Sequence, residues 1–146
     1  MKHLQLFENF EDIESICRRY RITNYTINPD GTVDVDGNVD LGAEPSLLIS
    51  KRLPIKFGKV SGNFSCSDNQ LTSLDGSPTT VGGHFYCSNN LLTTLEGGPK
   101  EVGGNFFCSH NLLTSLEGCP SEFKYIYCKW NPMDKIYYIF GSFKEY

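Results

Sequence analysis

The chain has 146 residues, of which 39% are hydrophobic, and its formal net charge is −4 at pH 7. This length suits a single domain, 1–146, and leaves no room for a second, catalytic domain. The near-balanced charge argues against a nucleic-acid-binding surface, and no apolar segment suits a signal peptide or a membrane span. We therefore expect a cytoplasmic protein that binds neither nucleic acid nor membrane.

Residues 8–20 carry the pattern of an amphipathic helix. Apolar residues recur at helical spacing from Phe10 to Tyr20, and Asn9 is suited to cap the helix start, with Asp12 three residues later. We expect this helix to cover one end of the structure that follows.

Residues 23–41 change to the alternating pattern of strands. Tyr25 and Ile27 alternate, 29–31 is a Pro-Asp-Gly turn, and 33–41 alternate again around a bend at 36–38. The pattern predicts a β-hairpin, so that residues 1–45 form an N-terminal cap of helix and hairpin.

The acidic residues of this hairpin have some likeness to a calcium-binding loop. The run from Asp34 to Asp40 with Glu44 places its glycine and its glutamate at the wrong positions of such a loop. We favour exposed aspartates that discourage pairing at a sheet edge.

Residues 46–131 contain a repeated block. Four columns of residues recur in steps of 21, 21 and 20, except that the prolines recur only three times: Asn69, Asn90, Asn111, Asn131; Cys66, Cys87, Cys108, Cys128; Leu71, Leu92, Leu113, Met133; and Pro78, Pro99, Pro120. Such a period predicts a stack of similar coils. We expect a degenerate first coil over 42–60 and an atypical last coil over 121–131. In the C-terminal cap, 132–146, we expect a short helix that Asn131 caps and that ends at Gly141.

The repeat resembles that of leucine-rich-repeat proteins. Phe106, Cys108, Asn111, Leu113 and Leu116 match the frame L-x-L-x-x-N/C-x-L. Over residues 24–140, approximately, the sequence is similar to that of small leucine-rich-repeat proteins of tailed bacteriophages. The resemblance implies an α/β repeat fold, a short right-handed solenoid with a parallel β-sheet on its concave face. It further implies a phage-encoded inhibitor that acts on a bacterial host or defence protein in the host cytoplasm.

The cysteine and asparagine columns are expected to face inward. Cys66 and its three equivalents share one phase of the coil, where reduced thiols pack well, and steps of 21 do not suit a zinc site. The Asn column is expected to be buried, with each amide bonded to backbone groups of its own and adjacent coils.

The outward positions of the strands carry the candidate site. Alternation places aromatic residues on the outer face of the last coils, where large exposed rings favour protein binding. The candidate protein-binding residues are Tyr86, Phe107, Tyr125, Tyr127, Trp130, His84, Asn105, His110 and Lys129. Two alternatives stay open: the rings only stack on one another, or they lie beneath the C-terminal helix.

No motif of a catalytic, metal or cofactor site is present. His84 and His110 fall in different columns, and the serines after the cysteines are repeat residues. We predict a non-enzyme without cofactor that binds a protein partner. The alternative is a structural or assembly protein that acts through homo-oligomerisation, and the sequence leaves the oligomeric state open.

Overall fold

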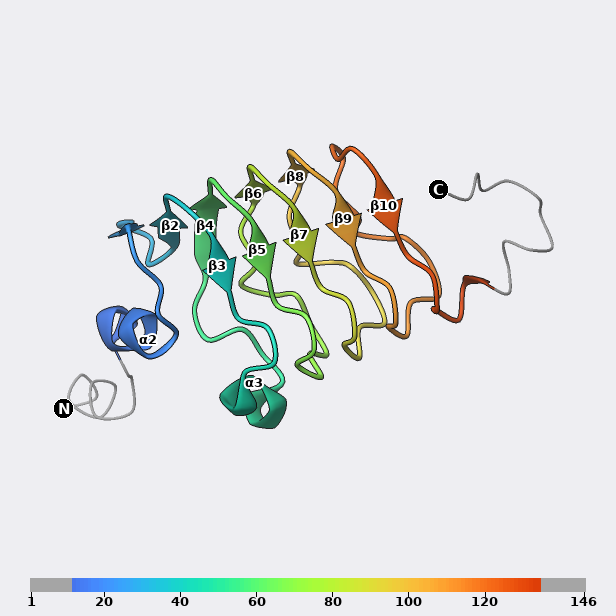
Figure 1. Cartoon of the computed structure of the whole chain (residues 1–146), viewed down its shortest axis with the longest axis horizontal. Helices are drawn as coiled ribbons and strands as arrows, with labels where there is room; N and C mark the ends of the chain where they lie inside the picture. The colour runs from blue at the N-terminus through green and yellow to red at the C-terminus, as the bar shows by residue number, and fades with distance from the viewer. Residues whose placement is uncertain (1–11, 135–146) are drawn as a thin grey trace.

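The computed structural model describes residues 12–134, which form a parallel-sheet β-solenoid of about five turns (Figure 1). Each turn before the last adds one short strand to each of two sheets, and the last turn adds a strand to sheet B alone. Sheet A has the order β1 (Tyr25–Ile27), β2 (Val33–Val35), β4 (Phe57–Val60), β6 (Thr80–Val81), β8 (Glu101–Val102). Sheet B has the order β3 (Val39–Asp40), β5 (Phe64–Ser65), β7 (Phe85–Tyr86), β9 (Phe106–Phe107), β10 (Ile126–Tyr127). The sequence predicted a single parallel sheet, which corresponds to sheet B.

The predicted hairpin is confirmed, but most of it belongs to the solenoid. β1 and β2 pair antiparallel, whereas β2 pairs parallel with β4 and β3 pairs parallel with β5. Val39 lies opposite Phe64, a step of 25 residues instead of 21. The first coil therefore begins at Val33, earlier than the expected 42–60.

Two helices lie beside the first coils (Figure 1). Helix α3 (Pro45–Ser50) was not predicted; it starts with a proline and occupies the longer connection of the first coil. Helix α2 (Ile13–Arg19) falls within the predicted helix, but its N-cap is Asp12, whose carboxylate accepts the Ser15 N–H at 2.7 Å. The expected cap, Asn9, lies outside the described residues.

Glycines sit where the chain bends from sheet A into sheet B, because adjacent coils touch there. A Cβ added at Gly83 would meet the side-chain oxygen of Asn63 and the backbone of Gly62, and Gly104 is similarly close to Gly83. These glycines have no positive φ. Their role is to let the backbones of neighbouring coils approach closely.

The predicted inward columns form the core. Phe64, Phe85 and Phe106 are fully buried and stack with centroids 5.5 and 5.2 Å apart, both pairs within 6° of parallel. Alongside them run two other buried columns, made by Cys66, Cys87, Cys108 and by Leu71, Leu92, Leu113, Met133. Like side chains therefore pack on like side chains from coil to coil.

The asparagine column is buried and hydrogen-bonded as expected. Asn90 Nδ2 donates to the carbonyls of Cys66 and Cys87, each at 3.0 Å, and its Oδ1 accepts the N–H groups of Asn69 and Leu71 at 3.1 and 2.9 Å. One amide thus satisfies backbone groups of two coils.

The cysteines of the repeat are free thiols. Burial raises the pKa of Cys66 to about 12, and burial together with neighbouring thiols raises that of Cys87 well above its ordinary value. Cys119 and Cys128 are only half-buried.

The last coil is atypical, as predicted. Glu122 bridges to Glu101 at a step of 21, but Ile126 pairs with Phe106 at a step of 20, so the bend is one residue shorter. Phe123 takes the place of buried Val102 yet is 36% exposed. The predicted C-terminal helix lies outside the described residues, apart from its first three positions. Over residues 12–134, no helix has the length and apolar character that crossing a bilayer needs.

Candidate binding surface

The outer face of sheet B carries the candidate site. In β3, β5, β7 and β9 the residues that flank the outward one are buried, for example Val39 and Leu41 around Asp40, and in β10 they are half-buried. The register of the five strands aligns the outward residues in one column: Asp40, Ser65, Tyr86, Phe107, Tyr127. The face therefore changes from small and acidic in the first coils to aromatic in the last three.

The aromatic part of this column is an ordered stack. The rings of Tyr86 and Phe107 lie 4.7 Å apart and 5° from parallel, and those of Phe107 and Tyr127 lie 4.7 Å apart and 9° from parallel. All three side chains are half-buried because each covers its neighbour. We call these three residues the outer stack. The rings thus stack on one another, and the half-buried side chains keep part of their surface exposed.

A second column follows at the strand exits, with Asp68, Asn89, His110 and Trp130. All four are exposed and have left-handed backbone, with φ between 54° and 63°. Asp and Asn adopt this conformation readily, whereas a bulky residue there is strained by roughly 1–2 kcal/mol. Trp130 is nevertheless 69% exposed, and its ring stacks on His110 at 5.6 Å.

His84 and Asn105 belong to a third column, which joins coils through their backbones. The N–H of Asn105 donates to His84 Nδ1 at 2.8 Å, as the N–H of His84 donates to Asn63 Oδ1 at 2.8 Å. The His84 ring also makes edge contacts with Tyr86 and Phe107, both at 6.0 Å. His84 thus supports the outer stack from the side.

The remaining candidates lie in the last coil. Tyr125 is 53% exposed, and Lys129 is exposed beside Trp130. The carbonyls of Tyr125 and Lys129 accept the N–H groups of Phe106 and His110 at 2.8 and 3.0 Å, which fixes both residues in the ladder. The structure therefore places all nine predicted residues on or beside the outer face of sheet B.

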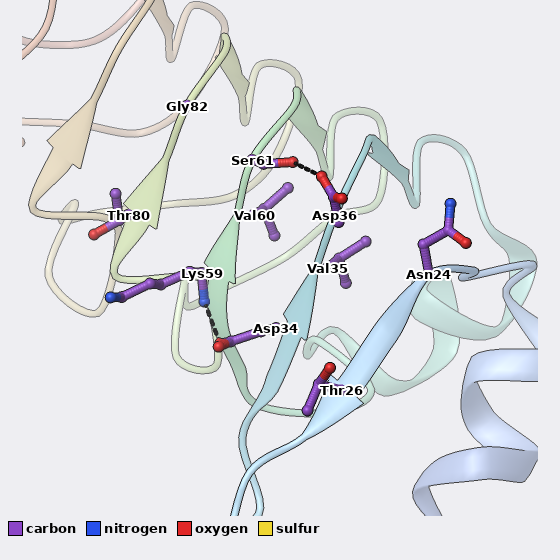
Figure 2. Close-up of a pocket in the computed structure, with 10 residues that line it drawn as sticks. All are labelled: Asn24, Thr26, Asp34, Val35, Asp36, Lys59, Val60, Ser61, Thr80 and Gly82. Carbon is purple, nitrogen blue, oxygen red and sulfur yellow. Dashed lines mark hydrogen bonds between the residues drawn. The ribbon is translucent and has the colours of Figure 1, made fainter.

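A groove of about 380 Å³ crosses the outer face of sheet A (Figure 2). Figure 2 shows two aspartates bonded across to the next coil: Asp34 accepts the Lys59 N–H, and Asp36 accepts the Ser61 hydroxyl, each at 2.8 Å. These carboxylates hold the first two coils together. Within residues 12–134, no group of three or more His, Cys, Asp or Glu side chains is arranged to hold a metal ion.

Sequence reasoning missed Asp40 as part of the outer face. The four extra residues in the first connection hide its equivalence to Ser65, so the sequence pattern predicts a hairpin at Asp40. The alternation of buried Val39, exposed Asp40 and buried Leu41 was the available signal, because it matches Phe64, Ser65 and Cys66.

Comparisons of the chain with protein-family models, with curated proteins and with solved structures gave no match.

Proposed function

We propose that the chain is a non-catalytic, protein-binding solenoid of the leucine-rich-repeat kind, and that it binds a partner protein through the aromatic end of sheet B. In this proposal α2 and β1 cap the N-terminal end of the stack. The resemblance to phage proteins suggests that the partner is a bacterial host protein which binding inhibits.

The observation that carries the proposal is the state of Trp130. Its large ring is 69% exposed, and its backbone has φ of 63°, a conformation that its equivalents Asp68 and Asn89 tolerate better. Folding gains little from this residue, because the exposed ring buries little surface while the backbone is strained. Such outliers cluster at functional sites, and tryptophan is among the residues that dominate binding interfaces.

The surroundings of Trp130 suit an interface. His110 holds the indole ring in place by stacking, and Lys129 supplies a charge at the rim. The outer stack beside them is rigid, since each ring is fixed by the rings of adjacent coils. Because these side chains are already ordered, this surface loses little conformational entropy when a partner binds.

The test is capture from a bacterial lysate by the tagged native chain, with Trp130→Ser in parallel. Leu112→Ser is the matched control, because Leu112 is a 47% exposed apolar residue outside the sheet B strands. We expect one protein to be retained by the native chain and by Leu112→Ser, and to be lost with Trp130→Ser. Equal retention by all three would refute the proposal, as would a stable homo-oligomer in light scattering that Trp130→Ser dissociates.

A further inference from the structure

The outer column of sheet B contains a gap beside the outer stack. Ser65 occupies the position next to Tyr86, and Asp40 occupies the position after it. One face of the Tyr86 ring is covered by Phe107 at 4.7 Å, while the other looks towards a side chain too small to cover it. The column therefore has an uncovered ring at one side of the gap and a carboxylate at the other.

The register of the sheet sets the width of this gap. Adjacent parallel strands lie about 4.8 Å apart, so Asp40 and Tyr86, two strands apart, are separated by about 10 Å along the column. A flat group placed over Ser65 at the 4.7 Å spacing of the outer stack would lie about midway between them. The gap therefore accepts one flat group and no more.

The polar atoms of the gap converge near Gly42. A Cβ added to Gly42 would lie 3.1 Å from Asp40 Oδ1 and 3.5 Å from Ser65 Oγ, so both oxygens border the space that this glycine leaves open. The N–H of Gly42 donates to Asp40 Oδ1 at 3.0 Å, which orients the carboxylate. Over residues 12–134 Asp40 has no ion-pair partner, and its side chain is exposed.

We infer that this gap, formed by Asp40, Ser65 and Tyr86, is a pocket for the guanidinium group of an arginine on the partner protein. The inference rests on the proposed function and names a residue type that the partner presents. An uncovered ring face and a facing carboxylate together select a cation that is also flat. The guanidinium group has both properties, whereas the lysine ammonium has the charge without the plane. Exposed Asp68, three residues after Ser65, adds negative charge at this end of the face.

The test is an NMR titration of the ¹⁵N-labelled full chain with N-acetyl-argininamide, compared with N-acetyl-lysinamide. We expect the arginine probe to shift the amide signals of Asp40, Ser65 and Tyr86, with affinity at least threefold above that of the lysine probe. Asp40→Asn keeps the acceptor for Gly42 but removes the charge, and is expected to weaken arginine binding by about threefold. Ser65→Tyr is expected to abolish it, because a tyrosine ring would fill the gap as Tyr86 and Tyr127 fill theirs.

Three results would overturn the inference: shifts centred away from the gap or no shifts, equal affinity for the two probes, or unchanged arginine binding by Asp40→Asn. Asp40→Asn decides the matter even if Ser65→Tyr does not fold, since Asp40 is exposed and its exchange is conservative. The probe binds without any partner, so Trp130→Ser should leave this titration unchanged. A negative result for arginine binding at the gap can therefore be distinguished from a negative result for partner capture.

Discussion

Two aromatic columns run along sheet B, one on each side. The inner column of Phe64, Phe85 and Phe106 and the outer stack of Tyr86, Phe107 and Tyr127 have nearly the same geometry, with parallel rings about 5 Å apart. They differ in burial, since the inner rings are fully buried and the outer rings are only half-buried. The same sheet thus uses one column to hold the coils together and leaves the other accessible at its ring edges.

This difference in burial gives the two columns different roles: the inner column stabilises the fold, and the outer stack is available for the proposed binding. Removal of an inner ring leaves a cavity among packed side chains, whereas removal of an outer ring opens a space that water fills. Four changes test how far this separation holds.

Phe85→Ala should give the largest effect, a loss of about 4 kcal/mol in the free energy of unfolding. Phe85 contacts rings in the coils on both sides, so the change removes two stacked pairs and leaves a cavity. Denaturation with urea, followed by circular dichroism, measures the loss. A loss below about 1 kcal/mol would show that the inner column does not support the fold.

Asn90→Leu should lower the free energy of unfolding by about 3 kcal/mol, because it leaves the buried N–H groups of Asn69 and Leu71 without partners. It also removes one of the two amide donors to each of the carbonyls of Cys66 and Cys87. Thr93→Leu, at an exposed position of the same coil, is the control and should have little effect. Equal melting temperatures for the two variants would contradict the role of the asparagine column.

Alkaline pH should weaken the inner columns. Folding raises the pKa of the buried thiols above the ordinary 9.0, so their contribution is fully present below pH 9 and is lost as pH rises towards about 12 for Cys66. Each thiol should add a slope of up to about 1.4 kcal/mol per pH unit. Between pH 9 and 11, Cys87→Ala should therefore show a shallower decline in unfolding free energy than the native chain. Identical slopes would mean that Cys87 titrates normally.

Phe107→Ala should give the smallest effect, about 1 kcal/mol, because the ring is half-buried and contributes mainly its stacking. The urea experiment used for Phe85→Ala measures it on the same scale. A loss as large as that of Phe85→Ala would mean that the outer stack is part of the core.

The regular coils were predictable because every column repeats at nearly constant phase. The burial of Phe85 and Cys87, the bonding of Asn90 and the outward direction of Tyr86 all follow from that phase and from strand alternation. Sheet A was not predictable in the same way, since its later strands each bury a single valine, as at Val81 and Val102, and so show no alternation of buried and outward residues.

The first coil was hidden by its insertion. The α3 connection changes the step from 21 to 25, so no fixed period reaches Val39 and Asp40. The left-handed backbone at Trp130 could not be predicted from this residue alone, because tryptophan does not favour that conformation. It follows from the turn that Asp68 and Asn89 make in the earlier coils.

The most direct test of the separation between fold and binding is the variant Phe107→Ser, Tyr127→Ser, Trp130→Ser, measured by thermal unfolding and by partner capture on the same preparation. We expect a folded solenoid with a cooperative transition and no captured partner. A variant that stays folded and captures the same partner as the native chain would contradict it, and so would a variant that no longer folds.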